Sequence, residues 1–161
     1  MKSKEKYTYN WPRPMVTVDA VVFGIVPENK QEIKLLLIKR GKEPFKGQWA
    51  FPGGFVGIDE ELETAVEREL QEETGLTDIK LEQMHTFGKV GRDPRGRQIT
   101  IAYIGIVKEN ETRIKGSDDA AEAKWFDISA LPEKMAFDHS QIAEFSIAEL
   151  KKKKINDYFV L

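Results

Sequence analysis

The chain has no cysteine, almost no net charge and no long apolar run. Without cysteine, its 161 residues can form neither disulfides nor thiolate metal sites, which is compatible with the cytosol. A formal net charge of -2 gives no bulk attraction to nucleic acid or to an acidic membrane, so an anionic ligand needs local cations or metal ions. The longest apolar runs, such as 35–38, are far too short to span a bilayer. We therefore expect a cytoplasmic protein without nucleic-acid or membrane partners.

Apolar and charged residues are balanced as in a globular protein, with 40% hydrophobic and 32% charged residues. The chain is long enough for one domain with a core, and we expect a single domain over 1–161. Runs rich in β-branched or aromatic residues predict strands, and a polar stretch at 27–32 predicts a turn. The predicted strands cover 16–23, 34–39, 49–51, 81–87, 99–107 and 124–127.

Two helices are predicted from their end signals. The first covers about 60–74, with Asp59 as a cap and Gly75 in the left-handed position past its end. The last helix follows a possible capping pair, Asp138 and Gln141. Strands and helices do not alternate strictly, so we predict an α/β (α+β) fold built in layers.

The first predicted helix places carboxylates beside its apolar stripe. On a helical wheel, Glu69, Glu72 and Glu73 lie among or next to the apolar residues. The opposite side carries the acids of an ordinary solvated face, Glu60, Glu63 and Glu67. Partly buried carboxylates are costly unless they are paired or bind a metal, and Arg68 can neutralise only one charge. Because hard cations prefer clustered carboxylates, the pattern favours a site for Mg²⁺ or Mn²⁺.

The same helix carries a motif of fixed spacing over 54–76. Its fixed residues are Gly54, Glu60, Arg68-Glu69-Leu70, Glu72-Glu73 and Gly75-Leu76. The stretch resembles the Nudix box, G-x5-E-x7-R-E-U-x-E-E-x-G-U with U apolar, at every fixed position. The resemblance implies a Nudix fold, in which a mixed sheet lies between helices and the box forms a loop, a helix and a loop.

The resemblance also implies roles for individual residues. Mg²⁺ would be bound mainly by Glu69 and Glu73, with Glu72 assisting directly or through water, and Arg68 would orient these carboxylates. Outside the box, Glu122 is predicted as a further ligand or base, because its Glu-Ala-Lys-Trp-Phe segment is similar to a common Nudix segment. Asp118 and Asp119 are weaker candidates, and a solvated acidic loop is the alternative for all three.

Glycines before the helix and arginines after it are candidate substrate-binding residues. Gly53 and Gly54 would let the backbone approach phosphates closely, although an ordinary tight turn also explains them. Guanidinium groups suit bidentate phosphate contacts, although a loop of this kind is more often a charged hairpin tip. The predicted phosphate-binding arginines are Arg92, Arg95 and Arg97, together with Arg40.

The loop also narrows the resemblance. Its Arg-Asp-Pro-Arg-Gly-Arg segment, with Arg13-Pro14 upstream, resembles ADP-ribose pyrophosphatases and the related Nudix domains of bacterial NAD-metabolism regulators. This implies hydrolysis of ADP-ribose to AMP and ribose 5-phosphate. The alternatives are another nucleotide, namely an oxidised nucleoside triphosphate, a dinucleoside polyphosphate or a sugar nucleotide, and a sensor that binds ADP-ribose without turnover. The sensor is disfavoured by the intact box and by a chain end that leaves no room for a winged-helix domain.

The N-terminal extension over 1–12 is rich in aromatic residues, including Tyr7, Tyr9 and Trp11. Such a run is difficult to place in a core, and it could instead reach across a dimer. We therefore include a homodimer among the expectations that the resemblance implies.

Overall fold

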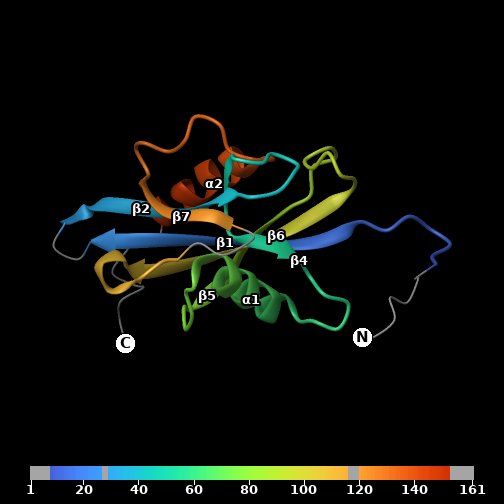
Figure 1. Cartoon of the computed structure of the whole chain (residues 1–161), viewed down its shortest axis with the longest axis horizontal. Coiled ribbons are helices and arrows are strands. Elements are labelled where there is room, and N and C mark those ends of the chain that lie inside the picture. Colours follow the sequence, from blue (N-terminus) through green and yellow to red (C-terminus); the bar gives the residue numbers. More distant parts are fainter. Residues whose placement is uncertain (1–7, 27–28, 116–119, 153–161) are drawn as a thin grey trace.

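A mixed sheet with one helix on each face forms the body of the molecule (Figure 1). The computed structural model describes residues 8–26, 29–115 and 120–152. The elements are β1 (Met15–Val26), β2 (Asn29–Arg40), β3 (Trp49–Ala50), β4 (Gly53–Phe55), α1 (Leu62–Thr74), β5 (Leu81–Phe87), β6 (Gln98–Lys108), the 3-10 helix η1 (Glu109–Glu111), β7 (Ala120–Asp127) and α2 (His139–Lys152). Five of the seven strands in the described residues follow the order β3-β2-β1-β6-β5. The other two lie off this path, β4 paired with β1 and β7 paired with β2. The predicted layered α/β (α+β) fold is therefore confirmed.

Strand β1 is central and is buried on both of its faces. It runs parallel to β6 and antiparallel to β2 and β4. Side chains alternate along a strand, so Val18 and Val22 pack in the cluster on the α1 side, whereas Val21 and Phe23 pack in the cluster on the α2 side. This double burial explains why the strand is almost entirely apolar.

Two strand predictions were wrong. Strand β2 begins at Asn29, inside the stretch predicted as a turn, because an antiparallel ladder with β1 extends to the pair Val26 and Asn29. After β3 ends at Ala50, Gly53 and Gly54 belong to a strand that was not predicted. They form β4, and Gly54 pairs with Val18 of β1. The glycine pair therefore lies on the sheet beside α1.

Helix α1 begins later than predicted, and Asp59 is not its cap. The N-cap is Glu61, without a side-chain cap hydrogen bond. Glu60 stays outside the helix because its N–H donates to the Gly57 carbonyl in a preceding turn. The other end was predicted correctly, since Gly75 has a φ of 74° and donates its N–H to the Gln71 carbonyl.

Helix α2 starts at His139, as expected, but the Asp138 side chain does not pair with Gln141 as predicted. The Asp138 carbonyl accepts the Gln141 N–H at 2.9 Å and closes the first turn. Its carboxylate instead accepts two hydrogen bonds from Arg92, at 2.9 and 2.6 Å. This ion pair fastens the loop between β5 and β6 to the start of α2. Across the ranges that the structure describes, no helix has the length and apolarity of a membrane span.

Candidate active site

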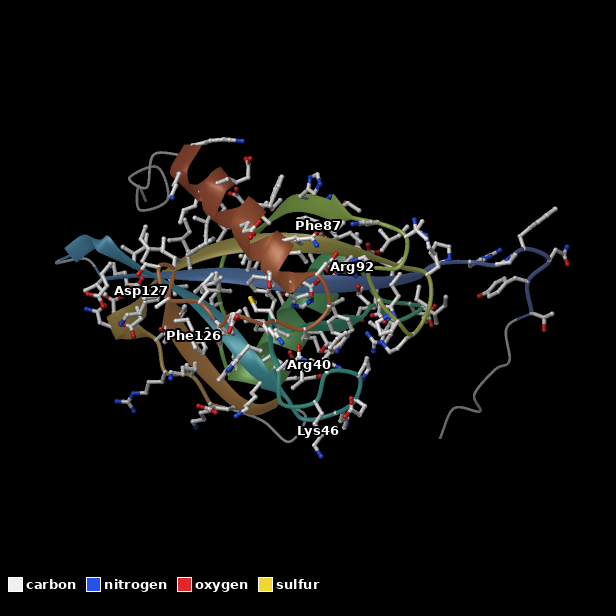
Figure 2. The ribbon with its side chains drawn as sticks, turned by 90° about the horizontal axis from the view of Figure 1, so that it is seen from above. Arg40, Lys46, Phe87, Arg92, Phe126 and Asp127 are labelled. Carbon is white, nitrogen blue, oxygen red and sulfur yellow. The ribbon has the colours of Figure 1, made fainter. Side chains whose placement is uncertain are left out.

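A cleft of about 460 Å³ lies between α1, β4 and the loop before α2. Its walls come from the ends of β1, β2 and β6, from β4, from the inner side of α1 and from the loop between β5 and β6. Figure 2 shows Arg40 and Arg92, two of its lining residues, near the N-terminal end of α2. The volume is that of a typical small-molecule site.

Two of the predicted metal-binding glutamates face this cleft across β4. Glu73 accepts the N–H of Gly53 at 2.9 Å. A Cβ atom on Gly54 would lie 2.4 Å from the Glu69 Oε1 atom, and one on Gly53 would lie 2.2 Å from the Val18 carbonyl oxygen. Only glycine therefore fits at position 53 beside β1, whereas a side chain at position 54 would displace the Glu69 carboxylate.

The environment of these glutamates disfavours their charged form. Burial raises the pKa of Glu73 to about 8, against the opposing effect of the Gly53 hydrogen bond. Burial also raises the pKa of Glu69, although Arg68 opposes the shift. Glu72 differs from both, because its side chain is 60% exposed. Two partly buried carboxylates whose charged form is disfavoured are suitable ligands for a divalent cation.

Arg68 connects the acids of the box, except Glu73. Its guanidinium forms a bidentate pair with Glu60, at 2.7 and 2.9 Å. The same group donates to Glu69 at 2.6 Å and to Glu72 at 3.4 Å. The Arg68 hydrogen bonds are the main reason that the pKa of Glu60 falls to about 2. Glu60 thus holds Arg68 in place, and Arg68 in turn contacts Glu69 and Glu72 of α1.

A complete metal-binding group is not already assembled. Within the described ranges, no three acidic or histidine side chains are close enough together to hold a metal ion. Arg68 engages Glu69 while the Gly53 N–H engages Glu73, so the two carboxylates serve different partners. Each of these two hydrogen bonds uses one carboxylate oxygen, Oε1 of Glu69 and Oε2 of Glu73, so the second oxygen of each side chain can serve a cation.

Two of the four predicted arginines present their guanidinium groups to the cleft around one ring. The guanidinium of Arg40 lies 4.8 Å from the ring centroid of Phe137, and that of Arg95 lies 5.1 Å from it. Arg40 also donates to the Pro44 carbonyl at 2.8 Å, and Arg95 pairs with Asp93 at 2.7 Å. Burial and the nearby positive charge of Arg95 lower the pKa of Arg40. This crowding of positive charge favours an anionic ligand.

The other two arginines serve the loop itself. Arg92 lines the cleft, but its buried guanidinium is bound to Asp138. Arg97 donates to the Gly88 carbonyl at 2.7 Å and is not among the residues that line the cleft. Their predicted contacts with substrate stay predictions, and the structure does not bring Arg97 together with the other three.

Glu122 also lies away from the glutamates of α1. It is exposed on β7, opposite Lys39 of β2. By strand alternation it shares a face with Phe126, which packs in the cluster on the α2 side. Its catalytic role stays a prediction, while Asp118 and Asp119 lie outside the described residues.

A buried polar network at the floor of the cleft was missed from the sequence. Asp19 is 6% exposed and accepts a hydrogen bond from the Thr100 hydroxyl at 2.6 Å. His139 Nδ1 accepts the Phe51 N–H at 2.9 Å, and its Nε2 lies 3.7 Å from Asp19. Burial lowers the pKa of His139, which keeps the ring neutral. The available signal was that Asp19 is the one charged residue in the apolar strand β1.

The comparisons with known proteins agree with this geometry. A family model described as the NUDIX domain matches residues 16–145. The chain belongs to the Nudix family. The resemblance inferred from the box is therefore confirmed, over most of the chain.

Relatives within the family include an enzyme and a regulator. The chain is 44% identical to an ADP-ribose pyrophosphatase of Methanocaldococcus jannaschii, over 80% of this chain and 70% of the relative. It is 34% identical to the ADPR responsive transcriptional repressor NtrR of Acinetobacter baylyi, over 89% of this chain and 57% of the repressor. The chain thus spans little more than half of the repressor.

Solved structures of the family share the fold. The NUDIX domain of Shewanella oneidensis NrtR, crystallised with ADP ribose, has a TM-score of 0.76 and 32% identity, over 87% of this chain and 90% of that one. A second structure is a bifunctional NMN adenylyltransferase/ADP ribose pyrophosphatase of Francisella tularensis, complexed with AMP and a Mn ion. It has a TM-score of 0.69 and 30% identity, over 88% of this chain and 43% of that one. A mixed sheet between helices is therefore common to this Nudix chain and its relatives.

The N-terminal segment lies apart from the cleft. Trp11 is 80% exposed and Tyr9 is 43% exposed, beside the apolar side chains of Ile58 and Leu62. Tyr7 lies outside the described residues. The homodimer expected from this aromatic run stays a prediction.

Proposed function

We propose that this Nudix protein hydrolyses ADP-ribose to AMP and ribose 5-phosphate with the help of Mg²⁺. The observation that carries the proposal is the two-sided cleft: Glu69 and Glu73 line one wall, and Arg40 and Arg95 line the other. The carboxylates suit a cation and the guanidiniums suit phosphates, so a diphosphate with bound metal fits between them. The pyrophosphatase name of the archaeal relative supports the choice of substrate.

The proposed metal ligands are Glu69 and Glu73, with Glu72 at the exposed side. The structure of the Francisella relative with a Mn ion supports a divalent cation, and we propose Mg²⁺ with Mn²⁺ as a substitute. A bound divalent cation would activate the attacking water and offset charge on the phosphate oxygens.

The chain's own residues position these groups. Arg68 holds Glu69, the Gly53 N–H holds Glu73, and the glycines of β4 let the backbone come close to both carboxylates. Arg40 and Arg95 would neutralise phosphate oxygens, because both guanidiniums lie at the cleft around Phe137. The buried network of Asp19 would fix the floor below the substrate.

The test is a substrate panel with purified protein and Mg²⁺, read out by chromatography of the products. ADP-ribose, NADH, 8-oxo-dGTP and diadenosine polyphosphates would be compared at equal concentration. We expect ADP-ribose to have the highest kcat/KM, with AMP and ribose 5-phosphate as products and no turnover in EDTA. A strong preference for 8-oxo-dGTP would reject the substrate and keep the family assignment.

The second candidate function is sensing, favoured by the match to the Acinetobacter repressor over 89% of this chain. A sensor would bind ADP-ribose without cleaving it. Calorimetric binding of ADP-ribose combined with the absence of AMP after prolonged incubation with Mg²⁺ or Mn²⁺ would favour the sensor over the hydrolase.

A further inference from the structure

The floor of the cleft is a polar patch at the end of an apolar sheet face. On the α2 side of the sheet, Ala102 and Ile104 of β6 belong to the core. Toward the beginning of β6, the residues on that same face become Thr100 and Gln98, by strand alternation. Thr100 pairs in register with Thr17 of β1. Polar residues therefore replace core residues where the sheet meets the cleft.

Gln98 differs from its neighbours in this patch because its amide donor is unused. The Thr100 hydroxyl donates to Asp19 at 2.6 Å, and the Thr17 hydroxyl donates to the Ile99 carbonyl at 3.5 Å. The Nε2 atom of Gln98 is fully buried without a hydrogen-bond partner in the described part of the chain, and the residue is 1% exposed. Buried polar groups are nearly always satisfied, and leaving one unsatisfied destabilises a fold.

The position of Gln98 explains why such a donor would be kept. The residue lines the cleft together with Asp19 and Asp93, so a ligand in the cleft can come within reach of it. Asp93 is paired with Arg95, but the buried Asp19 carboxylate accepts the Thr100 hydroxyl and so disfavours a phosphate at this floor. A sugar hydroxyl can instead donate to a carboxylate and accept from an amide. The floor is thus chemically suited to a neutral group with several hydroxyls.

We propose that the Gln98 amide donates a hydrogen bond to a hydroxyl of a sugar in the substrate and so contributes to substrate selection. The identification of this sugar as a ribose of ADP-ribose rests on the proposed function. In the ligand-free protein, Gln98 is a destabilising residue whose cost is recovered when the sugar binds. A site that holds an unpaired donor discriminates against ligands without the matching acceptor.

The first test is thermal unfolding of the metal-free and ligand-free Gln98→Met protein. Methionine has nearly the same shape but no polar amide, so the melting temperature should rise by about 3 °C. The matched control is Thr100→Val, which removes a satisfied hydroxyl from the same floor and should lower the melting temperature by a similar amount. A lower melting temperature for Gln98→Met would overturn the proposal, because it would show that the amide stabilises the fold.

The second test is steady-state kinetics of the same variant. The KM for ADP-ribose should rise about tenfold, the value of one good hydrogen bond, while kcat changes little. Inorganic pyrophosphate, which has no sugar, should inhibit the variant and the wild type equally. An equal loss of affinity for pyrophosphate would overturn the proposal, since the effect would then not depend on a sugar.

These tests separate failure of the inference from failure of the proposed function. If the wild type does not cleave ADP-ribose, the function is rejected, and the kinetic comparison moves to a sugar nucleotide that it does cleave. If the wild type cleaves no sugar nucleotide, the role of Gln98 is tested by two other measurements. These are the melting temperature of Gln98→Met and calorimetric binding of ADP-ribose to the wild type and to the variant. A raised melting temperature with weakened binding supports the role of Gln98, and any other result overturns it.

Discussion

The two walls of the cleft are built in different ways. The α1 wall comes from one continuous stretch, in which Arg68 and the glutamates around it are held by contacts within the box. The opposite wall combines residues of β2, of the loop between β5 and β6, and Phe137. These segments meet only in the folded chain. The first wall has the groups that handle a metal and a diphosphate. The second has arginines that we propose to bind phosphate oxygens, and it is assembled from segments outside the box.

The largest expected effect is on the α1 wall. Replacing Glu73 with Gln should lower kcat by about 10²–10³-fold, the scale of losing one electrostatic group at the reacting centre. The amide can still accept the Gly53 N–H, so the fold should remain. Circular dichroism and steady-state rates with Mg²⁺ would check both statements. Glu67→Gln, on the exposed side of α1, is the matched control. An equal loss of rate in that variant would contradict a specific role for the cleft-facing Glu73.

On the second wall, Arg40→Met should act mainly on KM. The variant keeps the apolar stem but loses the charge above Phe137, so we expect the KM for ADP-ribose to rise about tenfold with a smaller change in kcat. Arg97→Met is the control, because Arg97 binds backbone carbonyls of its own loop. If Arg97→Met raised KM and Arg40→Met did not, the division of the four arginines would be wrong.

The same contrast explains what could be predicted from the sequence. Glu69, Glu72 and Glu73 were predicted as neighbours because a helix places positions three and four apart on one side. The role of Arg68 was instead implied by the resemblance to the Nudix box.

The four arginines were also predicted, but composition could not show that Arg92 is bound to Asp138 and Arg97 to the Gly88 carbonyl while Arg40 faces the cleft. Which arginine faces the cleft depends on contacts between residues far apart in the sequence. Arg92 and Asp138, for example, are 46 residues apart.

The errors within the fold have a similar cause. A pair of glycines ordinarily ends a strand, and only the approach of the Val18 carbonyl shows why β4 needs glycine at position 53. Phe137 and His139 were not selected because neither belongs to the box, and only the folded chain brings them to the cleft. Asp19 was the exception that the sequence did signal, as a charge within a strand buried on both faces.

Stability without metal should fall as the pH rises, because of the α1 wall. The pKa of Glu73 is about 8 in the folded protein and 4.5 without perturbation. Between these values the unfolded chain has lost this proton and the folded chain keeps it, so stability decreases from about pH 4.5 to 8. Melting temperatures in EDTA over this range should show the decrease. Glu73→Gln should flatten the curve, and an unchanged slope in that variant would assign the decrease to other groups.

The smallest expected effect concerns how the second wall is held. If the Phe137 ring positions both guanidiniums, Phe137→Leu should raise the KM for ADP-ribose about fivefold, because two cation–π contacts are lost, and Phe137→Tyr should restore it. Leucine keeps most of the apolar contact with Phe45, so the melting temperature should change less than the KM. An unchanged KM in Phe137→Leu would show that the Pro44 carbonyl and Asp93 suffice to hold Arg40 and Arg95. The second wall would then resemble the first, with its arginines fixed by hydrogen bonds to oxygen.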